Sequence, residues 1–167
     1  MRRRTGIIGL AAIGLVVGGL RGKVRRYEIV EASMEPELHP GDYIIAQRRS
    51  GGLVRGDIVI VPHPEIDGFE LVKRVVGLPG ETITLSNGQV HIDGSVLAEP
   101  WADGPVRPDG EWVLRTNQTF VLGDNRPVSS ADSRTIGPVD IESIAWKVAA
   151  RYWPPASIGR VTQASDR

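Results

Sequence analysis

Residues 69–92, FELVKRVVGLPGETITLSNGQVHI, decide the fold class. They begin with a run of mainly apolar and β-branched residues, FELVKRVVG, which is ended by Pro79 and Gly80. Two shorter runs follow, TITL and QVHI, and Asn87-Gly88 lies between them. Asn-Gly between alternating apolar residues is the signature of a two-residue type I′ hairpin. These residues therefore predict one long strand followed by a β-hairpin.

Similar short runs separated by turn residues occur on both sides of this stretch. YEIVEAS, YIIAQ and IVIV precede it, and EWVL, TFVLG and AWKVAARYW follow it. Strands at this spacing predict a mostly β domain of short antiparallel strands. Residues 93–110 are rich in Gly, Pro and Asp and predict a long loop that carries Trp101, and residues 123–137 predict a long polar loop. One helical turn is expected at residues 140–143.

The first 26 residues have a different pattern. Arg2, Arg3 and Arg4 precede an uncharged stretch of sixteen residues, 5–20, and a second basic cluster follows it. Sixteen helical residues reach about 24 Å, less than the roughly 30 Å hydrocarbon core, so flanking arginines must snorkel or the bilayer must thin. A cleavable signal peptide is the alternative, but no clear A-x-A-like site precedes the basic cluster. We therefore predict one transmembrane helix within residues 1–26, a β domain over 27–154 and a loose tail over 155–167.

Composition excludes several kinds of function. The 20 basic and 20 acidic residues cancel and are mixed along the chain, which disfavours a nucleic-acid partner. The chain has no cysteine, so it has neither a disulfide nor a thiol nucleophile. Its three histidines (His39, His63 and His91) do not have metal-ligand spacing. We expect no metal and no cofactor, and the remaining candidate nucleophiles are Ser, Thr and Lys.

Lys73 is the first candidate for chemistry. Strand alternation places it on one face with Phe69, Leu71 and Val75, so that one lysine lies in an apolar row. Burial lowers the pKa of a lysine and makes it a usable base, whereas deprotonating an ordinary lysine at pH 7 costs about 4.6 kcal/mol. Only three of the 20 basic residues are lysines, so arginine serves almost everywhere else. The alternative is a lysine whose stem crosses an apolar edge while its ammonium reaches water.

Ser33 and the polar loop are the other candidates. YEIVEAS predicts a strand that ends at Ser33, because Pro36 stops its continuation. A hydroxyl that caps a turn is the alternative for this serine. The loop contains GDNR at residues 123–126 and SADSR at 130–134, a dense set of donors and acceptors. A solvated loop tied by Asp/Arg pairs is the alternative there.

Together these segments resemble the type I signal peptidases of bacteria, which use a Ser/Lys dyad. SMEP at residues 33–36 fits the family's S-M-x-P box, and KRVVGLPGE at 73–81 fits its K-R-x-x-G-x-P-G-[DE] box. GDNR with SADSR fits the G-D-N-x…S-x-D-S-R box, and GDIV at 56–59 fits the strand between the first two. The boxes occur in the family's order, and the resemblance covers about residues 26–154.

The resemblance implies a membrane-anchored serine protease. Its N-terminus would be cytoplasmic, and its catalytic domain would lie outside the plasma membrane, where preproteins are cut after small-residue, A-x-A-like motifs. Ser33 would attack the scissile carbonyl, Lys73 would take and return the proton, and Ser130 would orient the lysine amine. The Ser33 backbone N–H would be one oxyanion donor.

The substrate is implied to bind as an added β-strand between residues 29–33 and 70–73. The walls of its pockets would be Ile29, Val30, Met34, Leu38, Leu71 and Val72. Support of the loop is implied for Arg74, Asp124, Asn125, Asp132 and Arg134, with Asp124 paired to Arg74 and Asp132 to Arg134.

One position departs from many members of the family. Glu31 stands two residues before the nucleophile, where many members have Ser or Gly, and an ionised carboxylate only accepts hydrogen bonds. The second oxyanion donor is therefore unidentified. Two other functions stay open: a maturation protease with the same dyad that serves one precursor, and a non-catalytic, membrane-tethered β module that binds peptides.

Overall fold

The computed structural model describes residues 22–161. Over this range the predicted mostly β fold is confirmed, with twelve strands, one α-helix and three 3-10 helices. The strands are β1 (Val24–Glu28), β2 (Tyr43–Arg48), β3 (Ile58–Pro62), β4 (Glu70–Gly77), β5 (Thr82–Ser86), β6 (Gln89–Ile92), β7 (Ser95–Val96), β8 (Gly110–Val113), β9 (Gln118–Leu122), β10 (Val139–Asp140), β11 (Trp146–Trp153) and β12 (Gly159–Arg160). The helices are η1 (Ala32–Met34), α1 (Ser133–Ile136), η2 (Ile141–Ser143) and η3 (Pro155–Ser157).

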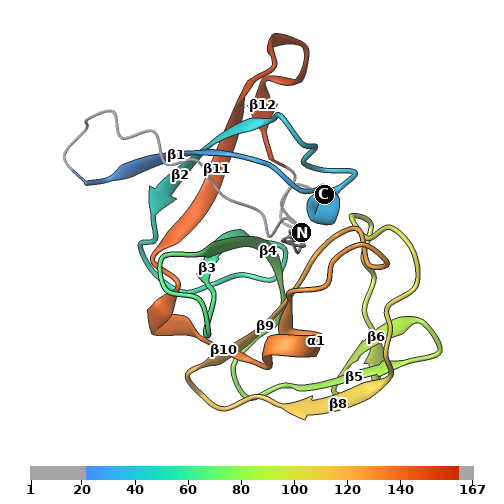
Figure 1. Cartoon of the computed structure of the whole chain (residues 1–167). Coiled ribbons are helices and arrows are strands. Elements are labelled where there is room, and N and C mark those ends of the chain that lie inside the picture. Colours follow the sequence, from blue (N-terminus) through green and yellow to red (C-terminus); the bar gives the residue numbers. More distant parts are fainter. Residues whose placement is uncertain (1–21, 162–167) are drawn as a thin grey trace, which may run out of the picture.

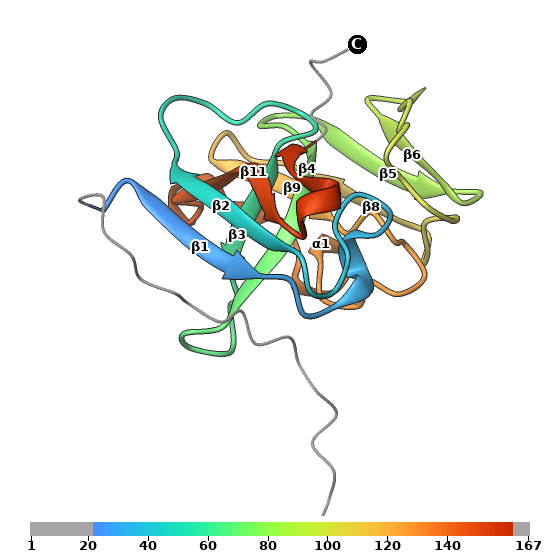
Figure 2. The same ribbon diagram turned by 90° about the horizontal axis from the view of Figure 1, so that it is seen from above.

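The strands form two antiparallel sheets. The larger has the order β1-β2-β11-β3-β4-β9-β10, with β12 paired to β11, and the smaller has the order β7-β6-β5-β8. Figures 1 and 2 both show β5 and β6 at one side of the molecule, away from β1 and β2, and Figure 1 shows β8 beside them. The predicted hairpin is β5–β6, and positive φ at Asn87 (53°) and Gly88 (78°) confirms its type I′ turn.

Strand β4 is the element that all three apolar clusters of the core share. Val72 belongs to the cluster beneath β1, β2 and β11, and Val76 to the cluster between the small sheet and β9. Leu71 and Val75 belong to the third cluster, against which Phe69 is half-buried. Every residue of β4 after Glu70 is buried, so both faces of this strand are covered by the rest of the domain.

Three local expectations are corrected by the structure. Strand β1 ends at Glu28, so Ser33 does not close a strand but lies in the 3-10 turn η1. The polar loop contains one helical turn, α1, and the loop over residues 93–110 contains the short strand β7. The helical turn expected at residues 140–143 is confirmed as η2.

At the C-terminal end the last described residues belong to the folded domain. After Pro154 the chain forms η3 and then β12, which pairs with β11, and Val161 is buried. The rest of the expected loose tail lies outside the described residues. The predicted membrane segment falls on residues 1–21, which also lie outside them. No helix within residues 22–161 is long and apolar enough to span a membrane.

Candidate active site

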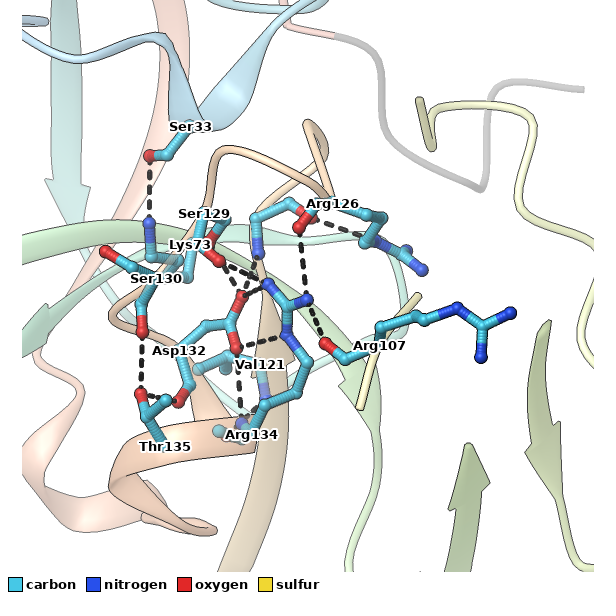
Figure 3. Close-up of polar contacts among 12 residues, drawn as sticks. Ser33, Lys73, Arg107, Val121, Arg126, Ser129, Ser130, Asp132, Arg134 and Thr135 are labelled. Atoms are coloured by element: carbon cyan, nitrogen blue, oxygen red, sulfur yellow. Dashed lines mark hydrogen bonds and ion pairs between the residues drawn. The ribbon is translucent and has the colours of Figure 1, made fainter. Parts of the chain in front are cut away.

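Ser33 and Lys73 meet from two different elements. The Lys73 Nζ on β4 and the Ser33 Oγ on η1 are 2.9 Å apart, within hydrogen-bond distance (Figure 3). Both side chains are buried, with 3% of Lys73 and 8% of Ser33 exposed. The protonated amine donates to the hydroxyl, and the neutral amine can accept the hydroxyl proton. The expected proximity of these two side chains is therefore present.

The surroundings of Lys73 favour its neutral form. Burial lowers the pKa of Lys73 from 10.5 to about 8, although the carboxylates of Asp132 and Glu31 act in the opposite direction. The apolar row that the sequence predicts supplies this burial, because Leu71 and Val75 flank the lysine on its face of β4. An amine with a pKa near 8 is neutral in a useful fraction of molecules at neutral to mildly alkaline pH.

Local backbone geometry turns Ser33 toward the lysine. The Glu35 N–H donates to the Ala32 carbonyl (3.2 Å) and closes the 3-10 turn, and Pro36 has no N–H with which to extend it. Ser33 and Met34 are the buried residues of this turn. The Ser33 carbonyl accepts a hydrogen bond from the Asn125 N–H (3.1 Å), which ties the serine to the polar loop.

Asp132 organises the polar loop beneath the dyad. Its carboxylate accepts hydrogen bonds from the Ser129 hydroxyl (2.7 Å), the Gly123 N–H (3.2 Å) and the Arg134 Nε (2.8 Å). Burial opposes its ionisation, but the hydrogen bonds and charge of Arg134 outweigh burial and hold the pKa of Asp132 below its usual value. Figure 3 shows the Arg134 guanidinium at the centre of this network, where it also donates to the Arg107 carbonyl (2.6 Å).

Arg74 and Asp124 form a second ion pair. Two nitrogens of Arg74 donate to the two carboxylate oxygens of Asp124 at 2.8 and 2.6 Å, and both side chains are buried. Arg74 also donates to the Gly56 carbonyl (2.9 Å). Both Asp/Arg pairings expected from the sequence are therefore present, and Asn125 lies beside them.

The two adjacent serines of the loop differ from the expectation. Ser130 is exposed, and within residues 22–161 its hydroxyl makes no hydrogen bond to the Lys73 amine. Its backbone carbonyl instead accepts from the Thr135 hydroxyl (2.8 Å). Ser129, which sequence reasoning missed, is buried against Asp132. Ser129 and Ser130 are adjacent in an irregular loop, where no strand or helix pattern applies. The sequence therefore could not show which of the two side chains points inward.

A small cleft opens at the dyad. Its volume is about 30 Å³, and its lining includes five of the six predicted pocket residues, namely Ile29, Val30, Met34, Leu71 and Val72. Leu38 does not line it, because this side chain is fully buried in the cluster beneath β1 and β2. Glu28, Glu31 and Glu70 also line the cleft, and the sequence did not indicate them as a group. Within the described range, no group of three or more His, Cys, Asp or Glu side chains is placed so that it could hold a metal ion.

Comparisons with known proteins show which family this chain is related to. A family model described as "Signal peptidase, peptidase S26" matches residues 2–153. Signal peptidase IB of Staphylococcus aureus (strain COL) is 31% identical over an alignment 167 positions long that covers 86% of each chain. Probable signal peptidase I-2 of Synechocystis sp. is 33% identical over an alignment 150 positions long that covers 83% of this chain and 67% of that protein. The crystal structure of a signal peptidase I from Enterococcus faecalis V583 superposes with a TM-score of 0.50 at 30% identity, covering 57% of this chain and 96% of that one.

Proposed function

This chain belongs to the signal peptidase S26 family, and we propose that Ser33 is its nucleophile and Lys73 its general base. The chain is a serine endopeptidase that removes signal peptides from preproteins. The observation that carries the assignment of the residues is the 2.9 Å approach of the buried Lys73 amine to the Ser33 hydroxyl. The lysine would take the proton as Ser33 attacks the scissile carbonyl and would return it to the leaving amine.

The proposed substrate site lies along the edge of β4. Strand β3 pairs with residues 70–74 of β4, whereas β9 pairs with β4 only from Arg74 onward. Among the described strands, none covers the second edge of residues 70–73, so a preprotein segment could add there as a strand. The small cleft beside Ser33 suits a small side chain, which supports cleavage after A-x-A-like motifs.

Other residues would serve this reaction without exchanging protons. The Ser33 N–H is the proposed first oxyanion donor, and Glu31 when ionised can only accept. Asp124, Asn125 and Asp132, together with Arg74 and Arg134, would fix the loop against the nucleophile. The orienting role of Ser130 stays a proposal that requires its hydroxyl to turn toward the amine.

Peptide cleavage tests the assignment. The full chain in detergent micelles should cleave several A-x-A peptides of unrelated flanking sequence after the second alanine, and Ser33→Ala should cleave none. Turnover of one peptide alone would favour a maturation protease dedicated to one precursor. Binding without turnover in the wild-type chain would favour the non-catalytic peptide-binding module and contradict the proposal.

We also propose a single membrane anchor with a cytoplasmic N-terminus and an extracytoplasmic catalytic domain. The apolar residues 5–20 support the anchor, while basic residues on both of its sides leave orientation undecided by charge. The orientation is supported by the substrate, whose cleavage site emerges on the outer face. Protease added to intact spheroplasts should remove the domain from Tyr27 onward. Full protection in intact spheroplasts, with digestion only after lysis, would reverse the topology.

A further inference from the structure

The loop over residues 97–109 packs against the turn at residues 123–126. The Asp103 N–H donates to the Asp124 carbonyl (2.8 Å), and the Arg126 N–H donates to the Asp103 carbonyl (2.9 Å). These bonds form a short parallel bridge between Asp103 and Asn125. The loop therefore supports this turn, which carries the GDNR box, through backbone contacts.

The turn at residues 123–126 also contacts the backbone of Ser33. Asn125 donates its backbone N–H to the Ser33 carbonyl at 3.1 Å. At Gly123 a Cβ atom would lie only 2.6 Å from the same carbonyl oxygen, so the turn and the backbone of Ser33 are in close contact. A shift of the turn would therefore shift the Ser33 backbone.

One buried ion pair joins the loop to the turn through side chains. The guanidinium of Arg126 binds the two carboxylate oxygens of Glu99 at 2.5 and 3.1 Å. The Arg126 Nε donates to the Gly123 carbonyl at 2.9 Å, so the same guanidinium also holds the turn. The Arg126 and Glu99 side chains are only 2% and 9% exposed, and bidentate pairs of this kind fix geometry.

We propose that Glu99 is a positioning residue for the nucleophile, which acts through Arg126 and the Gly123 carbonyl on the backbone of Ser33. This inference rests on the proposed function, because it takes Ser33 as the nucleophile. Glu99 does not line the cleft at the dyad, so it sets the place of the attacking group and not the affinity for substrate. A catalytic group displaced by about 1 Å can cost about 10²-fold in rate.

The first test is Glu99→Gln. We expect kcat to fall by about tenfold or more, with KM within about twofold of wild type. The acid limb of the pH dependence of kcat should stay in place, because the charges that act on Lys73 are Asp132, Glu31, Arg134 and Asp124. General loosening of the site would admit water and move that limb toward higher pH. A matched control is Asp42→Asn, which removes another buried carboxylate bound to an arginine, Arg151 (2.8 Å), and should lower Tm without lowering kcat.

A second variant separates positioning from stability. Glu99→Gln/Arg126→Gln removes both charges of this ion pair and so leaves no unpaired charge in its place, and its Tm should recover relative to Glu99→Gln. Its kcat should stay low, because the hydrogen bond from Arg126 to Gly123 is lost. Recovery of kcat together with Tm would overturn the proposal, as would a kcat within about twofold of wild type in Glu99→Gln. If Glu99→Gln does not fold, the kcat of the double variant alone tests the proposal. A low kcat supports it, and a kcat that recovers together with Tm overturns it. Failure of the wild-type chain to cleave any peptide would instead refute the proposed function.

Discussion

Lys73→Met is expected to abolish peptide cleavage and to leave Tm at pH 7 equal to or above that of the wild type. Methionine keeps the length and apolar packing of the side chain but has no proton to exchange. It also removes an amine whose charged form resists burial. Kinetic assay at enzyme concentrations high enough to detect traces of activity, together with thermal unfolding, checks both halves of this prediction.

The pH dependence of the stability difference has a defined sign. Burial lowers the pKa of Lys73 from 10.5 to about 8 in the folded chain, so the unfolded chain holds this proton more tightly. The free-energy penalty of folding is absent above pH 10.5, grows as the pH falls toward 8 and is constant below it, at about 3 kcal/mol. The gain in folding stability of Lys73→Met over wild type should depend on pH in the same way. A clearly lower Tm for Lys73→Met than for wild type at pH 7 would contradict this prediction.

Lys73→Arg distinguishes a base from a surface charge. A guanidinium is not deprotonated in this pH range, so this variant should be inactive even though it keeps the positive charge. It should also be less stable than wild type, because a permanent charge would enter the apolar row of β4. A lysine whose ammonium only reached water would tolerate arginine in both respects.

Gly123→Ala is expected to lower activity and stability together. A Cβ atom there would lie 2.3 Å from the Ser129 Oγ, 2.4 Å from the Ser129 Cβ and 2.6 Å from the Ser33 carbonyl oxygen. Neither a short side chain nor a backbone carbonyl can move aside freely. Overpacking of this kind costs about 1–3 kcal/mol in stability. Because the Ser33 backbone must shift, kcat should also fall by about 10²-fold.

Gly52→Ala is the matched control for this prediction. A Cβ at Gly52 would meet no atom within 4 Å, and the φ angle of this residue is not positive. Both kcat and Tm of Gly52→Ala should therefore match wild type. Wild-type kcat in Gly123→Ala would show that the turn at residues 123–126 does not hold the nucleophile.

Strand periodicity predicted the features that depend on local pattern. Lys73 in an apolar row follows from the alternation of β4, and the type I′ turn follows from Asn87-Gly88. The end of β1 was misplaced, because YEIVEAS is apolar enough for a strand, while Pro36 and the closing bond from Glu35 to Ala32 favour a 3-10 turn. Alternation fails wherever a short turn interrupts the strand.

Contacts between distant loops could not be predicted. Glu99 lies in a stretch rich in Gly, Pro and Asp without periodicity, and its partner Arg126 follows 27 residues later. The same stretch carries Trp101, which is buried with the Arg74 guanidinium 5.1 Å from its ring centroid. Only the folded structure shows that this loop contacts both Arg126 and Arg74.

The pKa of the Lys73 amine is the most direct measurement of the proposed dyad. The chain contains only three lysines, so ¹⁵N labelling of lysine side chains gives few NMR signals. The signal that is missing in Lys73→Met belongs to Lys73. We expect this amine to titrate at about 8, at the same pH as the acid limb of kcat/KM, which reports the free enzyme. Titration near 10.4, the value of an ordinary lysine, in an enzyme that is fully active at pH 7 would contradict Lys73 as the general base.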